Sequence, residues 1–163
     1  MSTADYAARE RRAALRRAAR LAAVQALYQM EVGGRGAAAV VREWREHRFG
    51  GADEAPKFTE ADEPFFERVV MGAVENQRDL DAAIARHLAK GWRLERIDST
   101  LRAALRAGAW ELIYGGDAPD AVVIDEYVEI AKAFFDGSEP KFVNAALDAL
   151  AEERGKTPRG ATA

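Results

Sequence analysis

The sequence contains no cysteine, only two histidines, and no long uninterrupted run of apolar residues. The absence of cysteine excludes disulfides, thiolate nucleophiles and thiolate metal sites. His47 and His87 belong to no HExxH or Glu-x-x-His pattern, so we expect no zinc or di-iron site and no cofactor. No apolar run approaches the roughly 20 residues that cross a bilayer, and residues 1–6 lack a signal-peptide core. We therefore expect no membrane association and a cytoplasmic location.

Strict alternation of apolar and polar residues is also missing, which disfavours β-strands. A glycine-rich phosphate-binding loop normally follows a β-strand, and no strand is predicted here. The usual nucleotide-binding sites are therefore not predicted. The 163 residues are 48% hydrophobic and 31% charged, an ordinary balance for one globular domain with a core.

Helical periodicity is present along most of the chain and is interrupted by glycine pairs and by turns. It predicts an all-α fold, a compact bundle of six to seven helices. The predicted helices cover residues 9–30, 37–47, a long segment from a capping box at Thr59 and Asp62 to residue 88, then 97–114, 117–134 and 139–153. A loop is expected at 50–57, a basic and partly flexible extension at 1–12, a single domain at 13–153, and a frayed polar tail at 154–163.

The expected core follows from the apolar positions that recur at three- and four-residue steps. The first helix would bury Leu15, Ala19, Ala22, Ala26 and Met30. The inner positions of the later helices are Ile97, Leu101, Ala104 or Leu105, Gly108 and Leu112, then Val123, Tyr127, Ile130, Ala131 and Phe134, then Phe142, Val143, Ala146, Leu147 and Leu150.

Positive charge is concentrated at the amino end, although the formal net charge is −3. Residues 1–20 hold six arginines against two acids, and Arg9, Arg12, Arg16 and Arg20 share one side of the first helix. A guanidinium binds phosphate oxygens through a fixed fork, so this row indicates a surface for a nucleic-acid backbone. A solvated basic helix and a membrane-surface helix are the alternatives, and the second lacks an apolar aromatic face.

An aromatic and an amide side chain follow the arginine row at Tyr28 and Gln25. This combination is used for stacking and base-edge contacts with single-stranded RNA, and ordinary helix packing is the equal alternative. The carboxylates of Asp125, Glu126 and Glu129 are interpreted as a solvated helix face with Lys132 as a local ion-pair partner, not as a metal site. The two histidines are interpreted as surface side chains.

Three motifs resemble those of the NusB family of transcription antitermination proteins. The first is a group of three arginines, Arg16, Arg17 and Arg20, followed by AVQALY at 23–28. The second is LRAGAWEL at 105–112. The third combines PDAVVIDE at 119–126, EIAK at 129–132 and KFVN at 141–144. They occur in the family's order and cover nearly the whole chain.

The resemblance implies two packed three-helix bundles and a non-catalytic RNA-binding adaptor. Such a protein pairs with the ribosomal protein NusE, binds the boxA element of nascent ribosomal RNA, and works in an antitermination complex with RNA polymerase. Carried over by position, the RNA-binding residues would be Arg16, Arg17, Arg20, Gln25, Tyr28, Ser138, Lys141, Phe142 and Asn144. A protein-partner surface is expected at Leu101, Glu111 and Pro119.

The sequence departs from the family pattern at several of these places. Ala18 replaces a third arginine of the cluster, and Arg9, Arg11 and Arg12 lie upstream as substitutes. Leu101 replaces an acidic residue expected to face NusE. Asp125 replaces an asparagine, Pro140 precedes Lys141, and residues 33–56 match no part of the pattern.

Two other functions remain as alternatives. One is a helical protein-binding module without RNA specificity. The other is a stray N-terminal domain of an rRNA cytosine methyltransferase, which is disfavoured because the chain has no cysteine and ends soon after the helices. A monomer and a homodimer both remain open for the unbound protein.

Overall fold

The computed structural model describes residues 2–49 and 60–155. Within these ranges every regular element is a helix, in agreement with the predicted all-α fold. The chain divides into two compact units, Met1–Met71 and Gly72–Ala163. The predicted loop at 50–57, the proposed cap at Thr59 and the tail from residue 156 onward lie outside the described residues.

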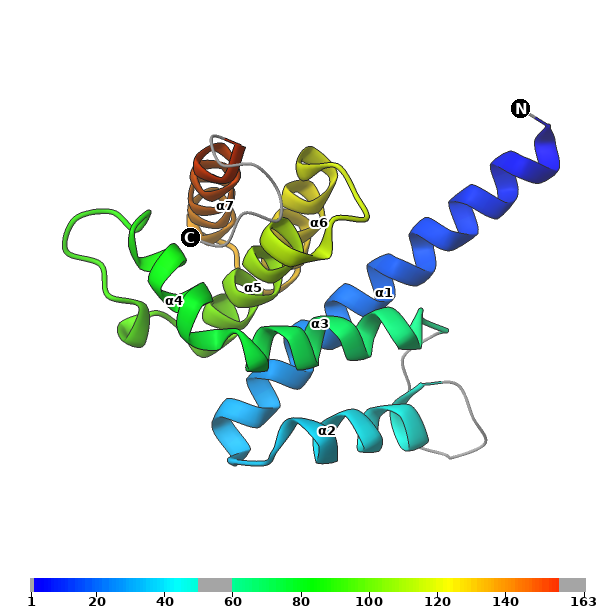
Figure 1. Cartoon of the computed structure of the whole chain (residues 1–163), viewed down its shortest axis with the longest axis horizontal. Helices are drawn as coiled ribbons and strands as arrows, with labels where there is room; N and C mark the ends of the chain where they lie inside the picture. Colours follow the sequence, from blue (N-terminus) through cyan, green and yellow to red (C-terminus); the bar gives the residue numbers. More distant parts are fainter. Residues whose placement is uncertain (1, 50–59, 156–163) are drawn as a thin grey trace. The chain divides into compact units, whose positions relative to one another are not determined.

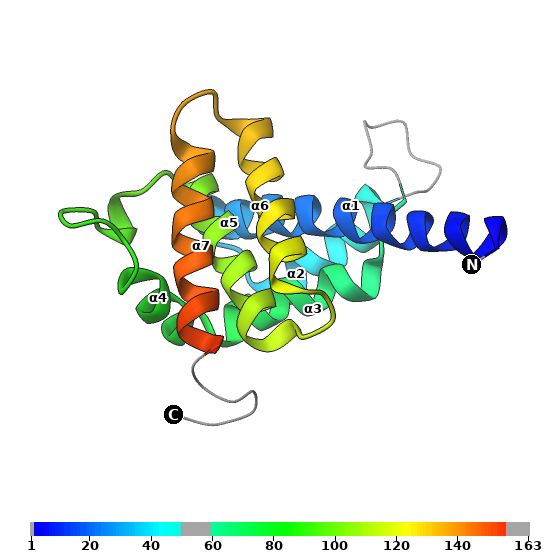
Figure 2. The same ribbon diagram turned by 90° about the horizontal axis from the view of Figure 1, so that it is seen from above.

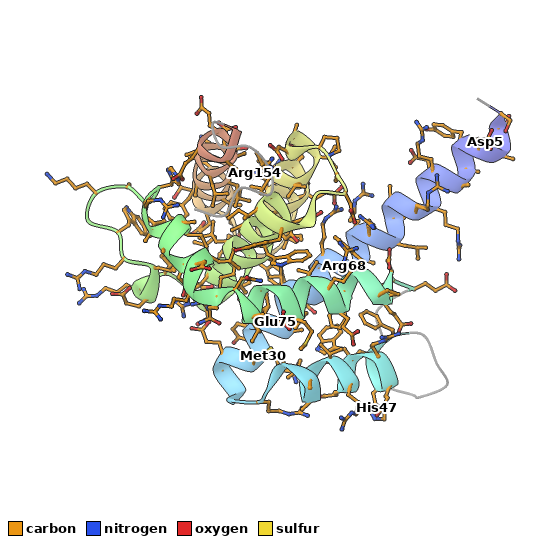
Figure 3. All side chains as sticks on the ribbon, viewed as in Figure 1. Asp5, Met30, His47, Arg68, Glu75 and Arg154 are labelled. Atoms are coloured by element: carbon orange, nitrogen blue, oxygen red, sulfur yellow. The ribbon has the colours of Figure 1, made fainter. Side chains whose placement is uncertain are left out.

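The first helix, α1 (Thr3–Gly33), is longer than the predicted segment 9–30. It begins early because Ser2 and Asp5 form a capping box: the Asp5 amide donates to Ser2 Oγ at 3.1 Å and the Ser2 amide to Asp5 Oδ2 at 3.3 Å (Figure 3). It ends at Gly34, whose φ of 70° suits glycine and whose amide donates to the Met30 carbonyl at 2.9 Å. Most of the basic extension at 1–12 is therefore helical, and its flexibility stays a prediction.

The first unit contains α1, α2 (Ala37–Glu43), the π-helical turn η1 (Trp44–Arg48) and the start of α3 (Glu63–Glu75), as Figure 1 shows. Side chains fasten α2 to α1. Trp44 Nε1 donates to Gln29 Oε1 at 3.1 Å, and Gln29 Nε2 donates to Glu43 Oε2 at 3.2 Å. The aromatic ring of Trp44 lies 5.7 Å from that of Phe66, and both side chains are buried. This aromatic contact forms part of the core of the unit.

The predicted continuous helix to residue 88 is wrong. The structure has two helices there, α3 (Glu63–Glu75) and α4 (Gln77–Ala85), separated at Asn76. At this break the Gly72 carbonyl accepts from both the Asn76 backbone amide, at 3.1 Å, and the Asn76 side-chain amide, at 2.8 Å. Apolar periodicity continues across the break, and this is why the sequence pattern did not reveal it.

The second unit contains α4, the 3₁₀ turn η2 (Leu94–Arg96), α5 (Ser99–Trp110), the π-helical turn η3 (Glu111–Gly115), α6 (Asp120–Phe134) and α7 (Glu139–Gly155). Helix α5 contacts α4, α6 and α7, while α6 and α7 lie side by side (Figures 1 and 2). The predicted inner positions of α5 are all buried. Asp98 caps this helix by accepting from the Thr100 amide at 2.8 Å.

The predicted core is confirmed except at four positions. Ala19, Ala22 and Ala26 are buried, whereas Leu15 and Met30 are partly exposed. Phe134, the last residue of α6, is exposed, and Phe142 is half-buried. Periodicity identifies the apolar face of a helix, but how far a neighbouring helix covers that face is decided by the tertiary structure.

Two glycines of the second unit allow close helix packing. A Cβ at Gly72 would lie 2.1 Å from Trp110 Nε1, and one at Gly108 would lie 2.8 Å from Leu147 Cδ1. Only a residue without a side chain fits at such distances. No helix in residues 2–49 and 60–155 is both long enough and apolar enough to cross a membrane.

Candidate nucleic-acid interface

The arginines of α1 differ in how far they reach into solvent. Arg9, Arg12 and Arg17 are exposed, Arg16 is half-buried, and Arg20 is only 3% exposed. The exposure of the predicted arginine row therefore falls along the helix. Arg9 and Arg12 are exposed to solvent, while Arg20, the last arginine of the row, is buried. Exposed guanidiniums are accessible to a ligand from solvent, whereas Arg20 would first have to leave its site.

Three guanidiniums surround the ring of Phe65, a buried residue of α3. The guanidinium carbon of Arg16 lies 4.2 Å from the ring centroid, that of Arg20 5.3 Å and that of Arg68 5.8 Å. Figure 3 labels Arg68 on α3. The negative face of an aromatic ring attracts such cations, so Phe65 helps to hold like charges together. We call Arg16, Arg20, Arg68 and Phe65 the arginine cluster.

An acidic residue at the start of α3 anchors this cluster. Asp62 Oδ2 lies 3.5 Å from Arg16 Nε, and Asp62 Oδ1 accepts from the Phe65 amide at 3.1 Å. The Asp62 amide donates to the Leu15 carbonyl at 3.0 Å, which joins the start of α3 to α1. One carboxylate thus caps α3 and places Arg16 against Phe65.

Gln25 and Tyr28 lie on α1, three residues apart, beyond the arginine cluster in the sequence. Tyr28 is 41% exposed and Gln25 is half-buried. A tyrosine with this exposure presents part of its ring to a ligand. This exposure is compatible with the predicted stacking of Tyr28 on a base, which stays a prediction beside the packing alternative.

The remaining predicted RNA-binding residues belong to the second unit. Ser138, Lys141 and Asn144 are exposed at and after the start of α7. Phe142 is half-buried, and its ring lies 5.3 Å from that of Trp92, a residue of the α4–α5 loop. The structure thus brings Phe142 together with an aromatic side chain that the sequence patterns did not identify.

Comparison with known proteins gives the family. The model of the NusB family matches residues 17–152, most of the chain. The chain belongs to the NusB family. It is 64% identical over 149 residues to the transcription antitermination protein NusB of Maricaulis maris (strain MCS10), covering 91% of this chain and 92% of that protein.

Solved structures of NusB proteins have the same fold. T. maritima NusB is 32% identical, with a TM-score of 0.69, and the match covers 84% of this chain and 90% of that chain. A structure of the antitermination factors NusB and NusE in complex with double-stranded RNA contains a chain that is 25% identical, with a TM-score of 0.70. That match covers 84% of this chain and 96% of the other.

The partner surface expected from the NusB resemblance needs correction at two of its three residues. Leu101 is 4% exposed and Glu111 is 3% exposed, and Glu111 Oε2 accepts from the hydroxyl of the buried Tyr127 at 3.0 Å. Both side chains face the interior in this conformation, because α5 is covered by its neighbouring helices. Pro119 is exposed, so the prediction applies to Pro119 alone.

The histidines and the acidic face of α6 take part in ion pairs. Glu129 pairs with Lys132 at 2.9 Å, as predicted. His47 is exposed, with Nε2 3.8 Å from a Glu46 carboxylate oxygen, whereas His87 is half-buried and hydrogen-bonded to Glu153. That hydrogen bond holds the pKa of the Glu153 carboxyl below its ordinary value. In the described ranges, no group of three or more potential metal-ligating side chains could hold a metal ion.

Sequence patterns missed two side chains that the structure adds, Arg68 and Trp92. Arg68 follows Phe65 by three residues, and this spacing places both residues on one face of a helix. The sequence could therefore have indicated their contact. Trp92 lies outside any helix, and its contact with Phe142 joins residues fifty positions apart. No periodicity identifies such a contact.

Proposed function

We propose that this protein is a transcription antitermination factor that binds the boxA element of nascent ribosomal RNA together with NusE. The observation that carries the proposal is the arginine cluster around Phe65, continued along α1 by the exposed Arg9, Arg12 and Arg17. Because the chain belongs to the NusB family, we infer that the ligand of this basic surface is RNA.

The mechanism is binding without chemical turnover. Exposed guanidiniums on α1 neutralise phosphates and supply most of the affinity, because each contact releases condensed counterions. Tyr28 and Gln25 give preference for unpaired bases through stacking and edge contacts. Lys141, Asn144 and Ser138 at the start of α7 supply further polar contacts. No step in this mechanism makes or breaks a covalent bond.

NusE supplies a second surface for the same RNA. The two proteins together are expected to contact more nucleotides than either alone, and the complex should bind more tightly. Pro119 is the residue of the expected partner surface that remains exposed for such a contact. Because bacterial transcripts emerge in the cytoplasm, we place the protein there, within the antitermination complex of RNA polymerase.

A fluorescence-anisotropy titration tests the proposal directly. The full chain, with and without NusE, is titrated into labelled single-stranded boxA RNA and into a scrambled strand of the same composition. We expect preference for boxA and tighter binding when NusE is present. Equal binding of both strands would favour a helical protein-binding module with solvated arginines.

Charge reversal identifies the surface responsible. Arg12→Glu combined with Arg17→Glu changes two exposed positions of α1 and should abolish most RNA binding while leaving the fold intact. Arg42→Glu combined with Arg78→Glu, at exposed positions on α2 and α4, is the matched control because it changes the net charge by the same amount. Undiminished binding by the α1 variant would remove this helix from the interface.

A further inference from the structure

Trp92 is an exposed aromatic residue of the loop between α4 and α5. It is 57% exposed, more than any other tryptophan or phenylalanine among the described residues. Trp44 and Trp110 are buried, as is usual for such a large apolar side chain. An exposed tryptophan that contacts a second aromatic ring is typical of a binding surface.

A tight turn holds Trp92 in this position. The Trp92 amide donates to the Ala89 carbonyl at 3.0 Å, and Gly91 between them has a φ of 91°. That backbone conformation suits glycine, which is a common third residue of such a turn. The loop leaves α4 on one side of the second unit (Figures 1 and 2). Trp92 is thus placed by a defined backbone structure.

The other side of this contact is Phe142, near the start of α7. The two ring centroids are 5.3 Å apart with an interplanar angle of 40°. Phe142 supports one part of the indole while more than half of the Trp92 surface stays open to solvent. A supported but exposed indole is the arrangement on which an unpaired nucleobase stacks.

Basic residues neighbour both aromatic residues in the sequence. Lys90 and Arg93 lie beside Trp92 in the loop, Arg96 follows in η2, and Lys141 precedes Phe142. All four are exposed, and none forms an ion pair with another described residue. Glu95 and Asp98 are the acidic residues of this loop, fewer than its basic residues, so the local charge is positive. A polyanion fits this surface better than an acidic or a purely apolar partner does.

We propose that Trp92, supported by Phe142, is a stacking platform for one unpaired base of the bound RNA, with Lys90, Arg93 and Lys141 contacting the adjacent phosphates. This inference rests on the proposed function and extends the RNA contacts expected at the start of α7 to the loop between α4 and α5. A base stacked on Trp92 would have its neighbouring phosphates within reach of these flexible cations.

Three variants of Trp92 separate stacking from simple covering of Phe142. Trp92→Phe keeps a flat aromatic face, Trp92→Leu keeps an apolar cover without one, and Trp92→Ala removes both. The Leu and Ala variants should bind single-stranded boxA RNA roughly 5- to 100-fold more weakly, which is the usual range for a lost base–aromatic stack. The Phe variant should stay close to the original protein. The salt dependence should be the same in all, since Trp92 carries no charge.

A spectroscopic measurement accompanies the titration. Stacking on a base should quench the Trp92 fluorescence of the original protein, and this quenching should be absent in Trp92→Phe, which still binds. Replacing the RNA bases one at a time by abasic sites should identify one position where the effect of Trp92→Ala disappears. Tyr114→Ala is the matched control, because Tyr114 is 47% exposed on η3 and belongs to neither contact region.

The outcomes distinguish this inference from the function on which it rests. If the original protein binds no RNA, the proposed function fails. If it binds boxA while Trp92→Leu and Trp92→Ala bind equally well, the stacking platform alone is refuted. A Trp92 effect that appears with NusE in the absence of RNA would assign this surface to a protein and would also overturn the inference.

Discussion

At the scale of single residues, burial separates arginines that the sequence pattern treats alike. Arg17 and Arg20 both belong to the predicted phosphate-binding set, but Arg17 is exposed and Arg20 is buried over Phe65. A buried cation beside an aromatic ring contributes to the stability of the fold, whereas an exposed one is available to a ligand. The two residues should therefore respond differently to the same substitution.

Replacing each arginine by alanine tests this difference. Arg17→Ala should weaken RNA binding with little change in stability, and it should reduce the magnitude of the log–log salt slope by about 0.7. Arg20→Ala should lower the free energy of unfolding by about 1–2 kcal/mol, because a desolvated cation–π contact is lost. Thermal unfolding and salt-dependent anisotropy measure the two effects. A stable Arg20→Ala protein that no longer binds RNA would reverse this assignment.

The hydroxyl of Tyr127 donates a hydrogen bond to Glu111 in the core of the second unit. Tyr127→Phe removes the donor to the buried Glu111 carboxylate and should destabilise the fold by roughly 1–3 kcal/mol, the usual penalty when a buried polar group loses its partner. The exposed Tyr114 provides the control substitution Tyr114→Phe, which should be nearly neutral. Urea denaturation curves of both variants give the comparison.

At the scale of helices, the distance between neighbouring helices decides whether a glycine can be replaced by a residue with a side chain. Gly72→Ala should destabilise the protein by about 1–3 kcal/mol, as is typical when a well-packed region is overfilled. The added Cβ would lie 2.1 Å from Trp110 Nε1, so that buried ring would have to move. Gly33→Ala is the control, since no atom lies within 4 Å of its added Cβ. Equal midpoints in thermal unfolding would show that Trp110 can shift at little cost.

The contact between α4 and α7 should make stability depend on pH. Arg86 and His87 of the α4 end pair with Glu153 of α7, and the hydrogen bond from His87 lowers the pKa of Glu153 below its ordinary value of 4.5. A carboxyl with a lowered pKa in the folded state stabilises the fold above its unfolded-state pKa. That contribution is lost as the pH falls through the lower, folded-state pKa.

Glu153→Gln measures this contribution. Near neutral pH the variant should be less stable by less than about 1 kcal/mol, because the pair is solvent-exposed and screened. The difference should vanish as the pH falls below 4.5 toward the folded-state pKa of Glu153. Chemical denaturation at several pH values measures this difference in stability between the original protein and the variant. A difference that persists unchanged at low pH would mean that packing, and not ionisation, is responsible.

At the scale of the whole molecule, charge distribution decides ligand class more than net charge does. The chain is acidic overall, with a net charge of −3, yet the exposed side of α1 is basic. If roughly three to five phosphates are neutralised, the logarithm of affinity should fall with the logarithm of salt at a slope of about −2 to −4. A slope near zero would exclude a phosphate-binding surface altogether.

The amino-terminal turns of α1 should contribute to that slope. Arg9→Ala combined with Arg12→Ala removes two exposed cations that precede the family match at residue 17, and it should reduce the slope magnitude by about 1.4. Arg42→Ala on α2 should leave the slope unchanged. If the two variants behave alike, the extension lies outside the RNA footprint.

Much of this protein follows from its sequence because helical periodicity and short motifs are local properties. The all-α class, most helix bounds and the buried positions of α5 follow from three- and four-residue spacing. The three motifs together indicated the family, because each consists of residues close to one another in the sequence. The exposure of Tyr28 agrees with its predicted role but does not test it.

The tertiary structure alone decided which of these side chains remain accessible. Arg20, Leu101 and Glu111 are buried because neighbouring helices cover them, and no local pattern records that cover. The break at Asn76 coincides with a hydrogen bond from the Asn76 side chain to the Gly72 carbonyl. The contact between Trp92 and Phe142 joins a loop to a distant helix. Sequence spacing sets which face of a helix is apolar or basic, while burial depends on what the rest of the chain places against that face.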